Sequence, residues 1–124
     1  MTYKEPLPPG CPPDAAQEIA SARAVFRLVR ANPPSSDDFR SQRAENPNRV
    51  FRDVDECQAR GLSVFGRRGD AERANLLPNL RNRLLCRVRL LPGAGRIRRT
   101  GRGSHHTWWP FAAYDTLASC DIEP

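Results

Sequence analysis

Proline restricts the fold of this chain more than any other residue type. The 124 residues include 12 prolines, several of them within residues 6–13 and two at Pro33-Pro34. Each proline fixes φ and removes a backbone donor, so long uninterrupted elements are disfavoured. A chain of this length usually forms one domain. We therefore expect a proline-rich arm over residues 1–13 and a single domain with short elements over residues 14–124.

Basic residues are concentrated in the second half of the chain, and the whole chain has a formal net charge of +6. Residues 61–110 hold eleven arginines against Asp70 and Glu72, a balance of +9. Such a field attracts polyanions, so an acidic protein partner, nucleic acid or a phosphate-bearing small molecule has to be considered. The alternative is that GC-rich coding produced the arginine bias. No pattern for sequence-specific duplex recognition is present.

The four cysteines, Cys11, Cys57, Cys86 and Cys120, form no C-x-x-C pair. We therefore expect neither a metal site nor a cofactor. The N-terminus lacks the apolar core of a signal peptide, and no stretch approaches about 18 apolar residues, so no membrane association is expected. The sequence predicts a cytoplasmic protein with reduced thiols. Two disulfides in an exported protein are the alternative.

Residues 14–32 have the pattern of an amphipathic helix. Asp14 and Gln17 resemble a capping box, and apolar residues from Ile19 to Val29 recur at helical spacing while arginines occupy the other face. We interpret this arginine stripe as a solvated face. Shorter helical segments are predicted at residues 36–39, 53–60 and 70–77.

Four segments have the character of strands. Residues 62–65 are apolar and bounded by glycines, and residues 85–91 alternate with period two. The turn after them returns the chain through residues 96–100, which predicts an antiparallel hairpin, and residues 104–109 add another strand. The expected class is α+β: a small, mainly antiparallel sheet with the N-terminal amphipathic helix and the short helices packed on one face.

Both histidines and both tryptophans lie within six consecutive residues, 104–109. Histidine moves protons near neutral pH, arginine clamps phosphates, and tryptophan stacks on bases. These properties favour a ligand site in this segment and the preceding hairpin. The alternative is that the tryptophans fill the core and a histidine bonds to backbone. The predicted ligand-binding residues are Arg96, Arg98, Ser104, His105, His106 and Trp108.

Strand alternation places the two histidines on opposite faces. Thr107 shares the face of His105, so we expect His105 to be held by a backbone or hydroxyl hydrogen bond and to support stability. His106 is then expected to open to the arginine-lined surface and to contact the ligand.

The motifs over residues 61–65 (GLSVF) and 104–109 (SHHTWW) resemble a family of small uncharacterised bacterial proteins. This resemblance implies a small standalone bacterial domain and supplies no activity. The order of the predicted elements is also loosely similar to small ADP-ribosyltransferase-like folds. That similarity implies a nucleotide-acting enzyme whose pocket would contain Arg52, Ser63 and either His105 or His106.

The sequence thus predicts a small cytoplasmic accessory or binding protein. Its basic, aromatic site would attract an acidic partner, a nucleotide or single-stranded nucleic acid. The alternative is a nucleotide-acting enzyme at the same place, of the ADP-ribosyltransferase-like kind. An open cleft that brings Arg52 or Ser63 beside a histidine favours the enzyme, whereas a flat arginine-rich face favours binding. The sequence does not indicate the oligomeric state or the substrate.

Overall fold

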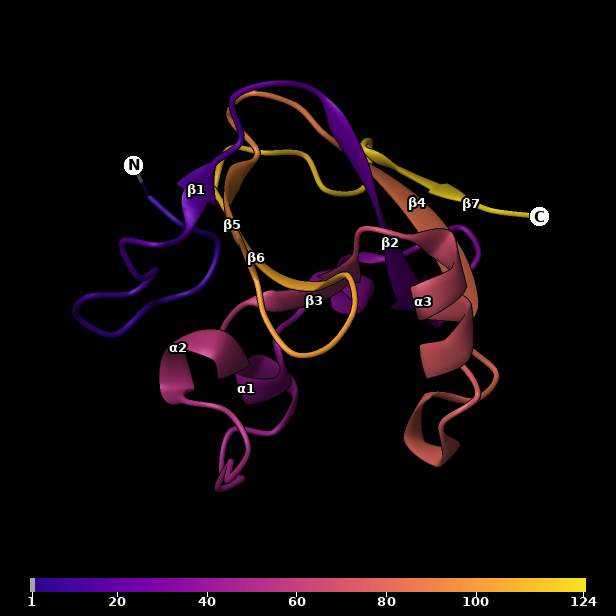
Figure 1. Cartoon of the computed structure of the whole chain (residues 1–124), viewed down its shortest axis with the longest axis horizontal. Helices are drawn as coiled ribbons and strands as arrows, with labels where there is room; N and C mark the ends of the chain where they lie inside the picture. Colours follow the sequence, from indigo (N-terminus) through magenta and orange to yellow (C-terminus); the bar gives the residue numbers. More distant parts are fainter. Residues whose placement is uncertain (1) are drawn as a thin grey trace.

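A seven-stranded antiparallel sheet dominates the computed structural model, which describes residues 2–124 (Figure 1). The strand order is β1-β5-β6-β3-β2-β4-β7. The strands are β1 (Gln17–Glu18), β2 (Arg23–Val29), β3 (Leu62–Phe65), β4 (Leu84–Leu90), β5 (Gly95–Arg99), β6 (His105–Pro110) and β7 (Cys120–Ile122). Three short α-helices, α1 (Gln42–Glu45), α2 (Glu56–Ala59) and α3 (Arg68–Ala74), and two 3-10 turns, η1 (Ser36–Phe39) and η2 (Pro78–Leu80), fill the connections. None of these helices has the length and apolar character that a membrane crossing requires.

The predicted α+β class with an N-terminal amphipathic helix is wrong, and the fold is closer to all-β. The C-terminal half of the predicted helix forms β2, which pairs antiparallel with β4 from Arg23↔Leu90 to Val29↔Leu84. Val25 and Val29 are both fully buried. Positions four apart share a face in a helix and also in a strand, so their spacing does not distinguish the two. β-branched side chains and pairing along the whole of β4 favour the strand.

Several short-range predictions are confirmed. Residues 62–65 form β3, residues 85–91 match β4 to within one residue, and residues 104–109 correspond to β6. The helical turn at residues 36–39 is η1, and it buries Phe39. The helix predicted over residues 53–60 is shorter than expected, because α2 is capped by Asp55.

The predicted hairpin between residues 85–91 and 96–100 is wrong. Both segments are strands, but β4 pairs with β2 and β7, whereas β5 pairs with β1 and β6. The connection buries Ala94, and Gly95 has a φ of +130°. A Cβ at Gly95 would overlap the carbonyl oxygen of Trp109, so this glycine lets the chain cross closely to β6. The turn therefore sends the chain to the other half of the sheet.

The core lies on one side of the curved sheet and takes alternate residues from its strands. Trp108 and Val64 come from β6 and β3, and Val25, Val88 and Leu90 come from β2 and β4. All five side chains are almost completely removed from solvent. Apolar burial of this kind is the main favourable term in folding. The core therefore belongs mainly to the sheet, and the short helices add Phe39 from η1.

The expectation of reduced thiols is wrong, because the four cysteines form two disulfides. Cys11 in the arm is bonded to Cys57 in α2, with Cα atoms 5.6 Å apart. Cys86 in β4 is bonded to Cys120 in β7, with Cα atoms 6.2 Å apart. The partners are 46 and 34 residues apart in the sequence, and the fold brings them together. Sequence spacing alone therefore could not pair them.

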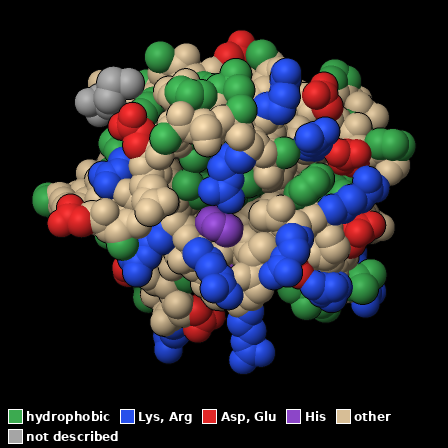
Figure 2. Space-filling model, turned by 45° about the horizontal axis from the view of Figure 1, so that its top comes forward, with side chains coloured by type: hydrophobic (Ala, Val, Ile, Leu, Met, Phe, Trp, Pro, Cys, Tyr) green, Lys and Arg blue, Asp and Glu red, His purple; other side chains and the backbone are tan. Residues whose placement is uncertain are grey.

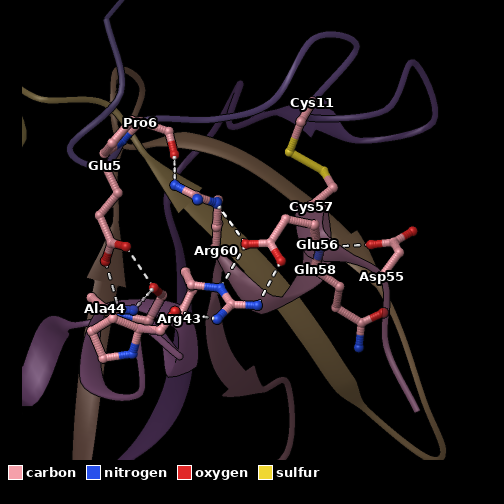
Figure 3. A network of polar contacts seen from close by, with 12 residues as sticks. Glu5, Pro6, Cys11, Arg43, Ala44, Asp55, Glu56, Cys57, Gln58 and Arg60 are labelled. Atoms are coloured by element: carbon pink, nitrogen blue, oxygen red, sulfur yellow. Dashed lines mark hydrogen bonds and ion pairs between the residues drawn. A yellow bond between two sulfur atoms is a disulfide. The ribbon is translucent and has the colours of Figure 1, made fainter. Parts of the chain in front are cut away.

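The proline-rich arm, described from residue 2, is docked on the rest of the chain. Tyr3 bridges to Phe111, and the Glu5 carboxylate accepts hydrogen bonds from the Ser41 amide and hydroxyl. Figure 3 shows this contact beside a second one, in which Arg60 donates to the Pro6 carbonyl. Together with the Cys11–Cys57 disulfide, these contacts tie the arm to α1 and α2.

Glu56 forms ion pairs with both Arg43 and Arg60, each at 2.8 Å (Figure 3). Hydrogen bonds from Arg43 and Arg60 lower the pKa of Glu56 to about 2 from an ordinary value of 4.5. Since the folded-state pKa is the lower one, this carboxylate contributes stability above the unfolded-state pKa, and the contribution is lost as the pH falls toward about 2.

We expect Glu56→Gln to melt below the wild type at neutral pH, and the two melting temperatures to converge as the pH approaches about 2. Calorimetric scans at several pH values measure the difference. Glu72→Gln is the control. Glu72 is exposed, and its ion pair with Arg68 is longer, with Nε and Oε2 3.8 Å apart, so it should contribute little stability. A difference for Glu56→Gln that stays constant across this pH range would contradict the assignment.

Candidate functional site

A pocket of about 530 Å³ is lined by residues from β2, β3, α1, the end of α3 and η2. Figure 1 shows β3 between α1 and α3. The pocket lining contains a single carboxylate, Glu45, and one histidine, His105. Leu77, Leu80 and Phe65 give it an apolar part. The six arginines in the lining are Arg27, Arg30, Arg40, Arg49, Arg83 and Arg102. The pocket is therefore strongly electropositive.

Arg27 is held in place by backbone carbonyl groups. Its Nε donates to the Asp38 carbonyl at 2.9 Å, and its Nη1 donates to the Ser63 carbonyl at 2.7 Å. Burial lowers the pKa of Arg27 to about 10, so the guanidinium stays charged at neutral pH. Within residues 2–124 it forms no ion pair with a carboxylate. A desolvated cation of this kind is costly unless an anion compensates it.

The carboxylate of Asp38, whose backbone carbonyl accepts from Arg27, is hydrogen-bonded elsewhere. This carboxylate accepts hydrogen bonds from the backbone amides of Arg30, Ala31 and Ser35. Burial acts to raise the pKa of Asp38, but these hydrogen bonds outweigh burial and lower it. Asp38 therefore serves to fix the end of β2 and the following turn.

The other arginines of the pocket differ in how far they are engaged. Arg30 pairs with Glu45 at 3.1 Å, and Arg40 donates to the Ala44 carbonyl. Arg49 lies over the ring of Phe51. Among the described residues, the guanidinium groups of Arg83 and Arg102 make no hydrogen bond and no ion pair. These two donors are free to bind a ligand anion.

His105 enters the pocket in a fixed orientation. Its Nδ1 lies 2.9 Å from the Thr100 carbonyl and 3.0 Å from the Thr100 hydroxyl, and its ring packs edge-on against Phe65. Because a carbonyl oxygen only accepts, this contact assigns the proton to Nδ1 and leaves Nε2 as an acceptor. Burial lowers the pKa of His105, although the hydrogen bond to the Thr100 carbonyl opposes this, and the imidazole is neutral at neutral pH.

Asp70 holds the turn that carries Arg102 and His105. Its Oδ2 accepts from the Ser104 amide at 3.0 Å and from the Ser104 hydroxyl at 2.7 Å. Gly103 has a φ of +60°, and a Cβ there would come within 3.0 Å of the same oxygen. The two hydrogen bonds lower the pKa of Asp70, so it is ionised at neutral pH. Ser104 is thus committed to the turn.

The structure does not bring the predicted ligand-binding residues together. Trp108 is 0% exposed, and its Nε1 donates to the Ala94 carbonyl at 3.1 Å, so it belongs to the core. Arg96 donates to the Ala16 carbonyl, and Arg98 is exposed on β5. His106 donates from Nδ1 to the Ser104 carbonyl at 2.7 Å and does not line the pocket.

Of the residues suggested by the enzyme alternative, Ser63 and His105 line the same pocket, whereas Arg52 is exposed and outside the lining. Sequence reasoning missed all six arginines of the pocket, and assigned Arg27 and Arg30 to a solvated helix face. No local pattern marks them, because they converge only in the folded chain. Figure 2 shows one face of the molecule, on which several basic side chains surround a histidine.

No group of three or more histidine, cysteine, aspartate or glutamate side chains placed to hold a metal ion occurs within residues 2–124. Comparison with known proteins adds no relative: no family model matches the chain, and neither a curated protein nor a solved structure matches it. The site therefore has to be interpreted from its own chemistry.

Proposed function

We propose that the arginine pocket binds a phosphate-bearing small molecule of nucleotide size. The observation that carries this proposal is the convergence of six arginines on one hollow with a single carboxylate. A volume of about 530 Å³ is typical of small-molecule sites. Arginine forks match phosphate oxygens and form charge-assisted hydrogen bonds. A hollow fits a nucleotide, free or at the end of a single strand, better than the flat surface of an acidic protein.

Arg83 and Arg102 provide the direct test. We expect Arg83→Gln and Arg102→Gln each to weaken binding of ADP and of adenosine 3′-monophosphate by about tenfold, the effect of losing one charge-assisted hydrogen bond. Isothermal titration calorimetry at two salt concentrations measures this, and wild-type binding should weaken as salt is added.

The matched control is Arg87→Gln combined with Arg98→Gln. These two arginines are exposed on β4 and β5 and lie outside the pocket lining, so the pair removes charge without touching the site. Equal losses of affinity in the control and in the pocket variants would show a diffuse field effect and overturn the proposal.

A nucleotide-acting enzyme is the second candidate, and the meeting of Ser63, Glu45 and His105 in one pocket supports it. A hydroxyl, a carboxylate and a neutral histidine are groups that move protons. The test is incubation with NAD, ATP or a single-stranded RNA, followed by chromatography of the products. A product that forms with the wild type and not with His105→Phe supports an enzyme, and unchanged substrates leave only binding.

We also infer that the chain folds under oxidising conditions. The cytoplasmic location expected from the sequence rested on the missing signal-peptide core and on reduced thiols, and the two disulfides remove the second ground. Disulfides persist mainly in oxidising compartments. Trapping free thiols with a thiol reagent during denaturing lysis of cells tests this inference, because a reduced cytoplasmic protein would then be labelled at all four cysteines, including the buried Cys86 and Cys120.

A further inference from the structure

Within the electropositive pocket, His105 is the neutral acceptor with the best-defined position. Glu45 is paired with Arg30, and the Ser63 carbonyl accepts from Arg27. Nδ1 of His105 is engaged by Thr100, so Nε2 is the ring nitrogen left for a ligand. His105 lines the pocket, and Nε2 has no hydrogen-bond partner among the described residues, so a phosphate oxygen, which only accepts, cannot pair with it. The geometry therefore calls for a donor on the ligand in addition to its phosphate.

Contacts on the other side of the imidazole ring fix the position of Nε2. The Thr100 hydroxyl lies 3.0 Å from His105 Nδ1 and 2.8 Å from the Thr107 hydroxyl, and Thr107 is buried. Phe65, directly across the β3–β6 ladder, packs its ring against the imidazole. The acceptor is therefore fixed before a ligand arrives, which makes it suitable for selecting a ligand group by geometry.

Arg102 belongs to the turn that precedes His105, and both residues line the pocket. The His105 amide donates to the Arg102 carbonyl at 3.2 Å, and the Asp70–Ser104 contact holds the turn between them. The Arg102 guanidinium has no partner among the described residues. Since both residues line the same pocket, a ligand that satisfies both groups carries a hydroxyl donor near its phosphate.

We propose that the pocket selects ribonucleotides over 2′-deoxyribonucleotides, an inference that rests on the proposed function. The ribose 2′-hydroxyl donates to His105 Nε2, and Arg102 binds the neighbouring 3′-phosphate. In this arrangement His105 determines specificity, and the arginines supply most of the affinity. His106 is the natural comparison, because its Nδ1 also donates to a backbone carbonyl while its ring lies outside the pocket lining.

The experiment compares adenosine 3′-monophosphate with 2′-deoxyadenosine 3′-monophosphate by calorimetry on the disulfide-bonded chain. We expect the ribonucleotide to bind the wild type about tenfold more tightly, because the deoxy analogue leaves a desolvated acceptor unpaired. His105→Phe should abolish the preference while both nucleotides still bind, and His106→Phe should retain it.

Nitrogen-15 NMR of the imidazoles gives a second readout that requires no variant. The Nε2 resonance of His105 should shift when the ribonucleotide is added and stay in place with the deoxyribonucleotide, whereas the His106 resonances should respond to neither. This measurement keeps the proposal testable if His105→Phe does not fold.

The outcomes separate the two proposals. If neither nucleotide binds, the proposed function fails. If both bind with equal affinity, the arginine pocket stands and the role of His105 is wrong. A preference that survives in His105→Phe would place the selecting group elsewhere and also overturn this inference.

Discussion

Removal of the Cys86–Cys120 disulfide is expected to lower the free energy of unfolding by about 4 kcal/mol. The bond closes a loop of 34 residues, and the chain-entropy model gives roughly this value for a loop of that size. The disulfide also fastens β7, a three-residue edge strand that pairs only with β4. A domain of this size has a total stability of about 5–15 kcal/mol, so the loss is a large part of it.

Urea unfolding of the double variant Cys86→Ala/Cys120→Ala measures the effect against the wild type. The matched comparison is Cys11→Ala/Cys57→Ala, which opens a loop of 46 residues and releases the arm at one point. The same model gives a similar loss for this loop. If a reducing agent makes all four thiols of the wild type reactive but leaves its unfolding curve unchanged, both expectations are contradicted.

Replacement of Trp108 by alanine is expected to cost about 3–5 kcal/mol, the range for removing a large aromatic side chain from a core. Trp108 has no exposed surface and packs edge-on against Tyr114 with ring centroids 6.1 Å apart. Its Nε1 donates to the Ala94 carbonyl, which lies in the connection that sends the chain from β4 to β5. The variant therefore loses both packing and a contact that positions this connection.

Urea unfolding of Trp108→Ala and His106→Ala separates the core role of this segment from a ligand role. The histidine variant should lose much less stability, because His106 is partly exposed and its one hydrogen bond is to a neighbouring carbonyl. If Trp108→Ala unfolds at the wild-type urea concentration but loses nucleotide binding, Trp108 contacts the ligand and its assignment to the core is wrong.

Local structure was predictable wherever a short segment carries its own signal. Alternation over residues 85–91 and bounding glycines around residues 62–65 identify β4 and β3, because a strand with one buried face has period two. The segment with the histidines and tryptophans was correctly predicted as a strand. Residues 23–29 were not, since the spacing of Val25 and Val29 suits a helix as well as a strand.

The sequence by itself determined the positions of most strands, the basic character of the chain and the strand alternation that separates His105 from His106. Only the tertiary structure decided the strand order, the pairing of the cysteines and the location of the pocket. Its six arginines come from β2 and the residue after it, the segments on both sides of α1, the residue before β4 and the turn before β6. Periodicity reports which face of one element is buried, whereas a site built from separate segments depends on how those elements are placed in space.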